Sequence, residues 1–347
     1  MEQLHIGVVF GGRSTEHEIS LKSVMTILRA MPKEYKKTAI GITKAGKWYA
    51  YFGEEPLIES GAWEGSPERA EIFFSSDCMF YEKDGKHIPL DIDVAFPVLH
   101  GQFGEDGTIQ GLFEMLGIRY VGCGVGASAN AMDKSMTKLL VSTEGIRQAD
   151  FVLVDRHNKN RLDELVEESE KKLGYPVFVK PCRSGSSVGV TKASDKAALR
   201  EGLESALLFD DRILIEEAID ARELECAVLS FGEETVAEVG EVISALEYYD
   251  YEAKYNNPTS RTETAPDLPQ KTVDEIREKA IRIFRLLDCK GLSRVDFFLD
   301  RKTGEVVFNE INTLPGFTSI SMYPMLIEKH GISHEELVRK LVEEALR

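Results

Sequence analysis

Two short segments near the end of the chain carry side chains that could bind a metal ion. Arg294 and Asp296 lie in one run of β-branched and aromatic residues, and Glu310 and Asn312 end a second run. The turn-like residues 301–304 between them predict a β-hairpin. Side chains alternate along a strand, so Arg294 shares a face with Asp296, which comes level with Glu310. The alternating residues are expected to face a core, namely Val295, Phe297, Leu299, Val307 and Ile311.

Two neighbouring carboxylates repel each other unless a cation lies between them. The oxygen atoms of Asp296, Glu310 and Asn312 are hard ligands of the kind that Mg²⁺ takes together with water and phosphate. The simpler alternative is a solvated hairpin face on which Arg294 and Asp296 form a weak ion pair. Gly316, in the turn after the hairpin, favours a binding site because glycine lets a ligand approach the backbone closely.

The composition limits the class of protein and its partners. A length of 347 residues predicts two or three domains, and 43% hydrophobic and 29% charged residues are typical of globular proteins. The net charge of -17 argues against nucleic acid or an anionic membrane as partner. The five cysteines have no zinc or disulfide spacing, and no signal peptide or membrane-spanning apolar run is evident. These features predict a cytoplasmic protein with reduced thiols.

The pattern of apolar runs predicts an α/β protein with α+β character in its central and C-terminal parts. Residues 6–10 form a buried strand that is followed by two glycines and a helical pattern, which is typical of a doubly wound α/β unit. Residues 93–98, 176–181 and 213–217 are further candidate strands. Residues 225–239 contain two runs around a turn, which predicts an antiparallel hairpin.

A glycine- and serine-rich segment could hold phosphate. Residues 184–189 follow a strand that ends in Lys180, and such a segment lets consecutive N–H groups converge on an anion. The order of a Walker loop is absent, so a simple hairpin turn is an equal alternative. Lys180 favours the phosphate site, because lysine is unusual in an apolar strand. Lys134 is a second candidate, with an ordinary surface helix lysine as its alternative.

Further polar residues follow other predicted strands. Glu216 and Glu217 end a strand that could present backbone groups to adenine and a carboxylate to ribose, although a plain strand end fits equally. His100 opens the glycine-dense loop 100–107, at the strand end where ligands bind in open α/β sheets. Glu16 lies beside a predicted helix N-terminus, and together these groups suit a zwitterion such as an amino acid. A lone histidine is more often structural than catalytic.

Four motifs agree in order and spacing with one family, and the chain resembles the D-alanine–D-alanine ligases of the ATP-grasp superfamily. The motifs occupy residues 11–20, 100–111, 180–189 and 291–316, so the resemblance covers essentially the whole chain. It implies a three-domain ATP-grasp fold whose first domain is Rossmann-like. The expected domains are residues 1–122, 123–216 and 217–347, with a lid loop at 246–269.

The resemblance also implies a reaction and its cofactors. ATP would phosphorylate one D-alanine, and the amine of a second D-alanine would attack the acylphosphate, giving a dipeptide for peptidoglycan. Two Mg²⁺ or Mn²⁺ ions would be held by Asp296, Glu310 and Asn312. Nucleotide contacts would come from Lys134, Lys180, Ser187, Glu216, Glu217, Ile219, Glu223 and Lys254.

The implied catalytic residues lie around the two amino acids. Glu16 would bind the first ammonium group, and Arg294 with the Gly316 N–H would stabilise the oxyanion of the tetrahedral intermediate. His100 would orient groups or transfer a proton. A hydrogen-bonded triad of Glu16, Ser186 and Tyr255 would tie the lid to the site. The residues expected to face the second substrate's carboxylate are Ser321 and Met322.

Some alternatives stay open in the sequence. The tyrosine-bearing segment 248–255 resembles the lid of D-alanine-adding enzymes, but a D-serine-adding ligase differs by only one hydroxyl at the second site. A catalytically silent nucleotide-binding protein on the same fold is a further alternative. The family is usually homodimeric, and a requirement for a monovalent cation is left open. Cys182, next to the phosphate segment, is expected to be a thiol that ATP protects from alkylation.

Overall fold

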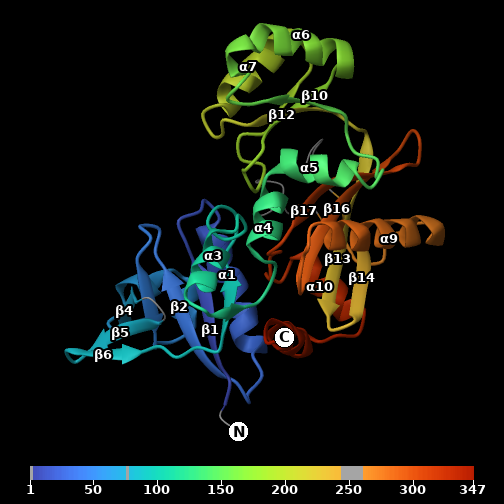
Figure 1. Ribbon diagram of the computed structural model, residues 1–347. Coiled ribbons are helices and arrows are strands. Elements are labelled where there is room, and N and C mark those ends of the chain that lie inside the picture. The colour runs from blue at the N-terminus through green and yellow to red at the C-terminus, as the bar shows by residue number, and fades with distance from the viewer. Residues whose placement is uncertain (1–2, 76–77, 244–260) are drawn as a thin grey trace.

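Three β-sheets with flanking helices form the computed structural model, which describes residues 3–75, 78–243 and 261–347 (Figure 1). The strands of the first sheet come from the N-terminal third, those of the second from the middle and those of the third from the C-terminal part. The predicted α/β class with an α+β remainder is confirmed. No helix in the described ranges is long and apolar enough to cross a membrane.

The first sheet has the strand order β6-β5-β4-β3-β2-β1-β7-β8. β1 (His5–Gly11) is buried along its whole length and pairs in parallel with β2 (Lys36–Ile42) and β7 (Val94–Val98). β1 and β7 confirm the strands predicted at residues 6–10 and 93–98. The other strands are β3 (Trp48–Tyr51), β4 (Arg69–Phe74), β5 (Met79–Lys83), β6 (Lys86–Pro89) and β8 (Arg119–Tyr120). The helices are α1 (His17–Ala30), α2 (Pro56–Glu59) and α3 (Thr108–Met115), with a 3₁₀ turn at Ala62–Gly65.

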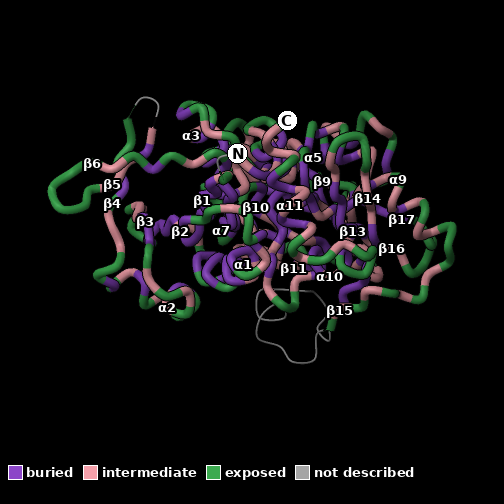
Figure 2. Tube along the Cα trace, turned by 90° about the horizontal axis from the view of Figure 1, so that it is seen from below, coloured by how far each residue is buried: buried purple, intermediate pink, exposed green. Residues whose placement is uncertain are grey.

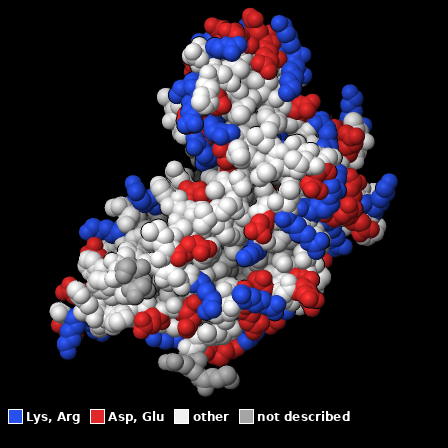
Figure 3. All heavy atoms as spheres, in the orientation of Figure 1, with Lys and Arg blue, Asp and Glu red and all other residues white. Residues whose placement is uncertain are grey.

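The second sheet is antiparallel, in the order β11-β10-β12-β9, and lies in the upper lobe of Figure 1. Its strands are β9 (Phe151–Val154), β10 (Val177–Pro181), β11 (Thr191–Ala193) and β12 (Ile213–Glu217). The helices of this part are α4 (Val125–Met132), α5 (Lys134–Ser142), α6 (Leu162–Leu173) and α7 (Lys196–Ala206), with a 3₁₀ turn at Lys159–Arg161. Figure 3 shows positively and negatively charged side chains on this lobe, and α6 and α7 form its outer end in Figure 1.

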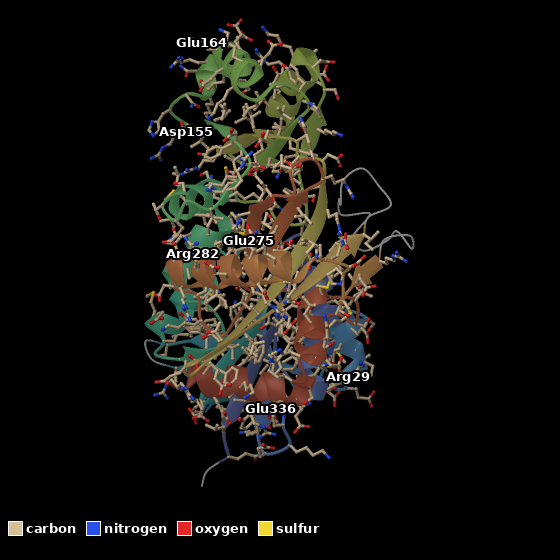
Figure 4. The ribbon with its side chains drawn as sticks, turned by 90° about the vertical axis from the view of Figure 1, so that its right-hand side faces the viewer. Arg29, Asp155, Glu164, Glu275, Arg282 and Glu336 are labelled. Carbon is tan, nitrogen blue, oxygen red and sulfur yellow. The ribbon has the colours of Figure 1, made fainter. Side chains whose placement is uncertain are left out.

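The third sheet has the order β15-β14-β13-β16-β17 and is antiparallel throughout. Its strands are β13 (Ala221–Phe231), β14 (Glu234–Ile243), β15 (Arg261–Glu263), β16 (Leu292–Asp300) and β17 (Val306–Asn312). The helices are α9 (Gln270–Leu286), α10 (Met322–Lys329) and α11 (His334–Ala345). α9 buries Ile276, Ala280 and Ile283, whereas Glu275 and Arg282 lie along its outer side in Figure 4.

The largest core joins the two ends of the chain. Ile6 and Phe10 of β1 belong to the same buried cluster as Leu337 and Leu341 of α11. In Figure 1 this last helix lies beside the N-terminal sheet, and Figure 2 shows the purple, buried trace concentrated around β1, α11 and β13. The contact fixes the first sheet against the third and so positions loops from both around one space.

The predicted hairpin is β16 and β17, and its register is confirmed. Asp296 pairs with Glu310, and Arg294 pairs with Asn312. The face predicted for Val307 is wrong: the register shifts after Asp296, so Phe297 pairs with Phe308 and Val307 pairs with Phe298. Val307 is nevertheless buried, with 1% of it exposed. Asn309 is the extra residue of β17 at this point. It moves the side chains of residues 306–308 to the faces opposite to those that strict alternation predicts.

Candidate active site

A cavity of about 580 Å³ lies where the three sheets meet. Glu16 and His100 reach it from loops of the first sheet, Lys180 from β10, and Arg294 and Glu310 from the hairpin. Segments far apart in sequence therefore line one space, and Figure 1 shows the strands and helices that carry them meeting between the upper lobe and the two lower sheets. The predicted residues Lys254 and Tyr255, and residues 246–260 of the predicted lid, lie outside the described residues.

Arg294 holds the carboxylate of Asp296. Its Nε lies 2.8 Å from Asp296 Oδ1 and its Nη2 lies 2.7 Å from Asp296 Oδ2, so the pair is bidentate. The Nε atom also lies 3.2 Å from Glu225 Oε2. Burial would lower the pKa of Arg294, but these carboxylates raise it well above its usual value. Asn312 donates from Nδ2 to Asp296 Oδ2 at 3.1 Å, which brings the amide next to the carboxylate.

This donor set fits a divalent cation. Asp296 and Glu310 are level across the ladder, and the amide oxygen of Asn312 adds a third hard donor type. Lys134 Nζ lies 3.4 Å from Glu310 Oε2, so a cation already balances this carboxylate. Burial would lower the pKa of Lys134, but Glu310 and other neighbouring groups together raise it above its usual value. The wall carries positive charge on Lys134 and negative charge on Asp296 and Glu310. It therefore matches an anionic ligand that brings a bound Mg²⁺ ion.

The glycine- and serine-rich segment crosses the cavity as an irregular loop. Ser186 and Ser187 have φ angles of 47° and 58°, which non-glycine residues rarely adopt and which are found mostly at functional loops. Lys134 Nζ donates to the carbonyl of Ser184 at 2.9 Å, and the Ser186 hydroxyl donates to Glu16. The loop is thus tied both to α5 and to the first sheet, as the predicted Glu16–Ser186 contact requires.

Another part of the cavity wall carries Glu216, which is 3% exposed and whose carboxylate lies between two lysines. Lys180 Nζ lies 2.5 Å from one oxygen and Lys138 Nζ lies 3.0 Å from the other. Burial would raise the pKa of Glu216, but the two lysines lower it to about 2. Glu217 turns its carboxylate to Arg147 Nη2 at 2.7 Å, so its backbone is the part that can serve a nucleotide. Two further predicted residues, Ile219 and Glu223, line the same cavity.

His100 is held in one orientation by a hydrogen-bond chain. Its Nδ1 lies 3.1 Å from the carbonyl of Leu314, which can only accept, so Nδ1 carries the proton. Nε2 lies 3.0 Å from the Ser23 hydroxyl, and Ser23 accepts from the Phe317 N–H at 3.2 Å. Burial lowers the pKa of His100. The neutral ring therefore clamps the turn that contains Gly316, which supports an orienting role.

The predicted second-substrate residues lie beside this turn. The Ser321 hydroxyl accepts from the Thr318 N–H at 3.0 Å, and both Ser321 and Met322 line the cavity. Met322 is 2% exposed and packs against Gly240. The wall at this end therefore combines the apolar Met322 with the hydroxyls of Ser321 and Thr318, which lie 2.8 Å apart.

Sequence reasoning did not select four residues that the structure brings into the site: Ser23, Glu105, Lys138 and Glu225. Lys138 follows Lys134 by one helical turn, which was a usable signal. Glu105 lies in the glycine-dense loop already singled out. Ser23 and Glu225 have no local signal, because their partners are distant in sequence.

Comparison with known proteins decides the family. The family described as "D-ala D-ala ligase N-terminus" matches residues 5–123, and "D-ala D-ala ligase C-terminus" matches residues 140–343. The chain belongs to the D-alanine–D-alanine ligase family. The D-alanine–D-alanine ligase of Acetivibrio thermocellus is 47% identical over 98% of this chain and 95% of its own. That of Caldicellulosiruptor bescii is 47% identical over 100% of this chain and 96% of its own.

Solved structures of this family match the whole fold. The VanG D-Ala:D-Ser ligase from Enterococcus faecalis has a TM-score of 0.89 and 37% identity, over 99% of this chain and 100% of that one. The D-alanine–D-alanine ligase from Coxiella burnetii has a TM-score of 0.85 and 32% identity, over 99% and 95% of the two chains. This ligase therefore has the three-part ATP-grasp architecture of its relatives.

Glu105 of this ligase should make stability fall as pH rises. Burial and the nearby Glu16 raise the pKa of Glu105 to about 8, above the unfolded value near ~4.3. Between pH ~4.3 and about 8 the folded state therefore binds a proton that the unfolded state has released. The free energy of unfolding falls as the pH rises through this range. Glu105→Gln should match the wild type at pH ~4 and melt several degrees higher above pH ~8, measured by circular dichroism. Glu201→Gln, on an exposed position of α7, should show no such difference.

Cys182 of this ligase should resist alkylation, contrary to the expectation from its position in the sequence. The residue is 0% exposed, and burial raises the pKa of its thiol to about 12. Iodoacetamide should label the half-buried Cys78 first and leave Cys182 unmodified with or without ATP, as measured by peptide mass spectrometry. Denaturant should make both react. Labelling of native Cys182 as fast as Cys78 would contradict its burial.

Proposed function

We propose that this protein joins two D-alanines to D-alanyl-D-alanine with the use of ATP, through a D-alanyl phosphate, as a step of peptidoglycan precursor synthesis. The observation that carries the proposal is one cavity that combines Glu16, Lys134, Lys180, Arg294 and the carboxylate face of the hairpin. Relatives that are 44–47% identical over nearly the whole chain carry the name D-alanine–D-alanine ligase.

The residues of the chain divide the work among themselves. Lys134, Lys180 and the loop at Ser186 and Ser187 bind the phosphates, while the wall at Glu216, Glu217, Ile219 and Glu223 receives adenosine. Glu16, fixed by Ser186, binds the ammonium of the first D-alanine. The nucleotide and lid roles of Lys254 and Tyr255 stay predictions, because both residues lie outside the described ranges.

Charge develops on the carbonyl oxygen when the second amine attacks. Arg294, held rigid by Asp296, and the Gly316 N–H, held by the His100 clamp, donate to that oxygen. Ser321 and Met322 receive the second substrate. Asp296, Glu310 and Asn312 would hold two Mg²⁺ or Mn²⁺ ions, which supply charge neutralisation on the phosphates.

The second substrate is the finer question, because a D-Ala:D-Ser ligase is among the similar structures. The apolar Met322 favours D-alanine, although an apolar pocket rejects an added hydroxyl only ~10²-fold. The test is a competition of D-alanine and D-serine in one assay, with the products resolved by mass. Mostly D-alanyl-D-serine would refute the proposal.

A silent nucleotide-binding protein would bind ATP without turnover. The presence of Lys134, Lys180, the hairpin carboxylates and Arg294 in one cavity favours the enzyme, since binding alone does not require an oxyanion donor. Phosphate release from ATP that depends on D-alanine is the expected result. The enzyme is also proposed to act as a cytoplasmic homodimer on small molecules, and titration with K⁺ would show whether a monovalent cation is required.

A further inference from the structure

The carboxylate of Glu216 has two cationic partners rather than one. Lys180 lies at Oε2 and Lys138 at Oε1, at 2.5 and 3.0 Å. The side chains are almost dry, with 3% of Glu216, 2% of Lys138 and 14% of Lys180 exposed. Removing a second lysine from water costs free energy that one carboxylate does not offset, so the arrangement needs an explanation.

The two lysines differ in what they face. Lys180 and Glu216 line the cavity, whereas Lys138 approaches from α5 behind the wall. Lys138 Nζ also donates to the carbonyl of Ala149 at 3.3 Å and lies 5.5 Å from the centre of the Phe151 ring. Its position is therefore fixed by the protein itself.

A charge count distinguishes the roles. One carboxylate balances one lysine, so the trio carries a surplus positive charge on its cavity side. If Lys138 were absent, Lys180 would form a neutral ion pair with Glu216 in a wall that is largely shielded from water. An incoming phosphate would then have to break that pair, and a buried carboxylate stripped of its cation is strongly unfavourable.

We propose that Lys138 is a positioning residue that neutralises Glu216 and thereby leaves Lys180 available to the phosphates of the nucleotide. The inference rests on the proposed use of ATP. It assigns Lys138 no contact with the ligand. Its effect is expected on ligands that carry phosphate and not on the nucleoside.

The test compares binding of ADP and adenosine to the wild type and Lys138→Met by equilibrium dialysis, without added metal. ADP affinity should fall at least tenfold, while adenosine affinity should change less than twofold. Lys138→Arg keeps the charge and should retain ADP affinity within threefold. Lys172→Met is the matched control, because Lys172 also contacts the Phe151 ring, at 5.9 Å, and a carbonyl, at 2.8 Å. It should bind both ligands like the wild type.

A double variant keeps the test decisive if Lys138→Met folds poorly. Glu216→Gln removes the need for a counter-ion, so adding Lys138→Met to it should change ADP affinity by threefold or less. Equal losses for ADP and adenosine, or unchanged ADP affinity in Lys138→Met, would overturn the role of Lys138. If the wild type itself fails to bind ADP, the proposed function fails as well, which separates the two ideas.

Discussion

Glu310→Gln is expected to lower the rate of D-alanine-dependent phosphate release by on the order of 10²-fold or more while the fold stays intact. The amide has the size of the carboxylate but no charge. Glu310 is level with Asp296 on the cavity face, so the change removes one of the two carboxylates proposed to hold the metal ions. The change also removes the ion-pair partner of Lys134, 3.4 Å away, so the melting temperature should fall slightly while the protein still folds.

The measurement is phosphate release over a range of Mg²⁺ concentrations, together with a thermal melt. The variant should need more Mg²⁺ for half-maximal rate. Glu305→Gln is the matched control, because Glu305 lies exposed in the turn of the same hairpin. Near-normal turnover by Glu310→Gln at low Mg²⁺ would refute the assignment of the metal site.

The sequence was most informative where local periodicity decides the structure. The alternation of apolar and polar residues in the hairpin predicted the pairing of Asp296 with Glu310, because a turn of known length fixes the register. The same rule misplaced Val307, because a single extra residue in one strand leaves no signature in the pattern.

Contacts between distant segments could not be predicted in this way. The core that Leu337 and Leu341 of α11 share with β1 depends on how the sheets pack on each other. Ser23 joins the site only because α1 brings it beside His100. Helical spacing marks a buried face but does not name the residue that faces it.

The candidate site was predictable in its residue types more than in their partners. Lys180 was selected because a lysine in an apolar strand is unusual, and the structure gives it Glu216 as partner. Glu217 was selected beside it, yet its carboxylate turns to Arg147. Neighbours in a strand point to opposite faces, so only one of the two glutamates can serve the cavity with its side chain.

Arg294→Lys is expected to lower kcat by ~10²–10³-fold, the loss typical of removing one oxyanion donor, with little change in ADP affinity. Arg294 spans both oxygens of Asp296 and reaches Glu225, which holds the planar group in one orientation. Lysine keeps the charge but offers a single point donor that cannot make this bidentate contact. A defect in the transition state therefore appears in kcat, whereas nucleotide binding is proposed to depend on Lys134 and Lys180.

Arg222→Lys separates this effect from the cost of disturbing the sheet. Arg222 makes the same bidentate contact with Glu241, at 2.7 and 2.6 Å, on the neighbouring strands of the same sheet. It does not line the cavity, so kcat of this variant should stay within threefold of the wild type while its melting temperature falls about as much as that of Arg294→Lys. An equal loss of kcat in both variants would mean that Arg294 acts through stability. A loss confined to Arg294→Lys would assign it to the reacting oxygen.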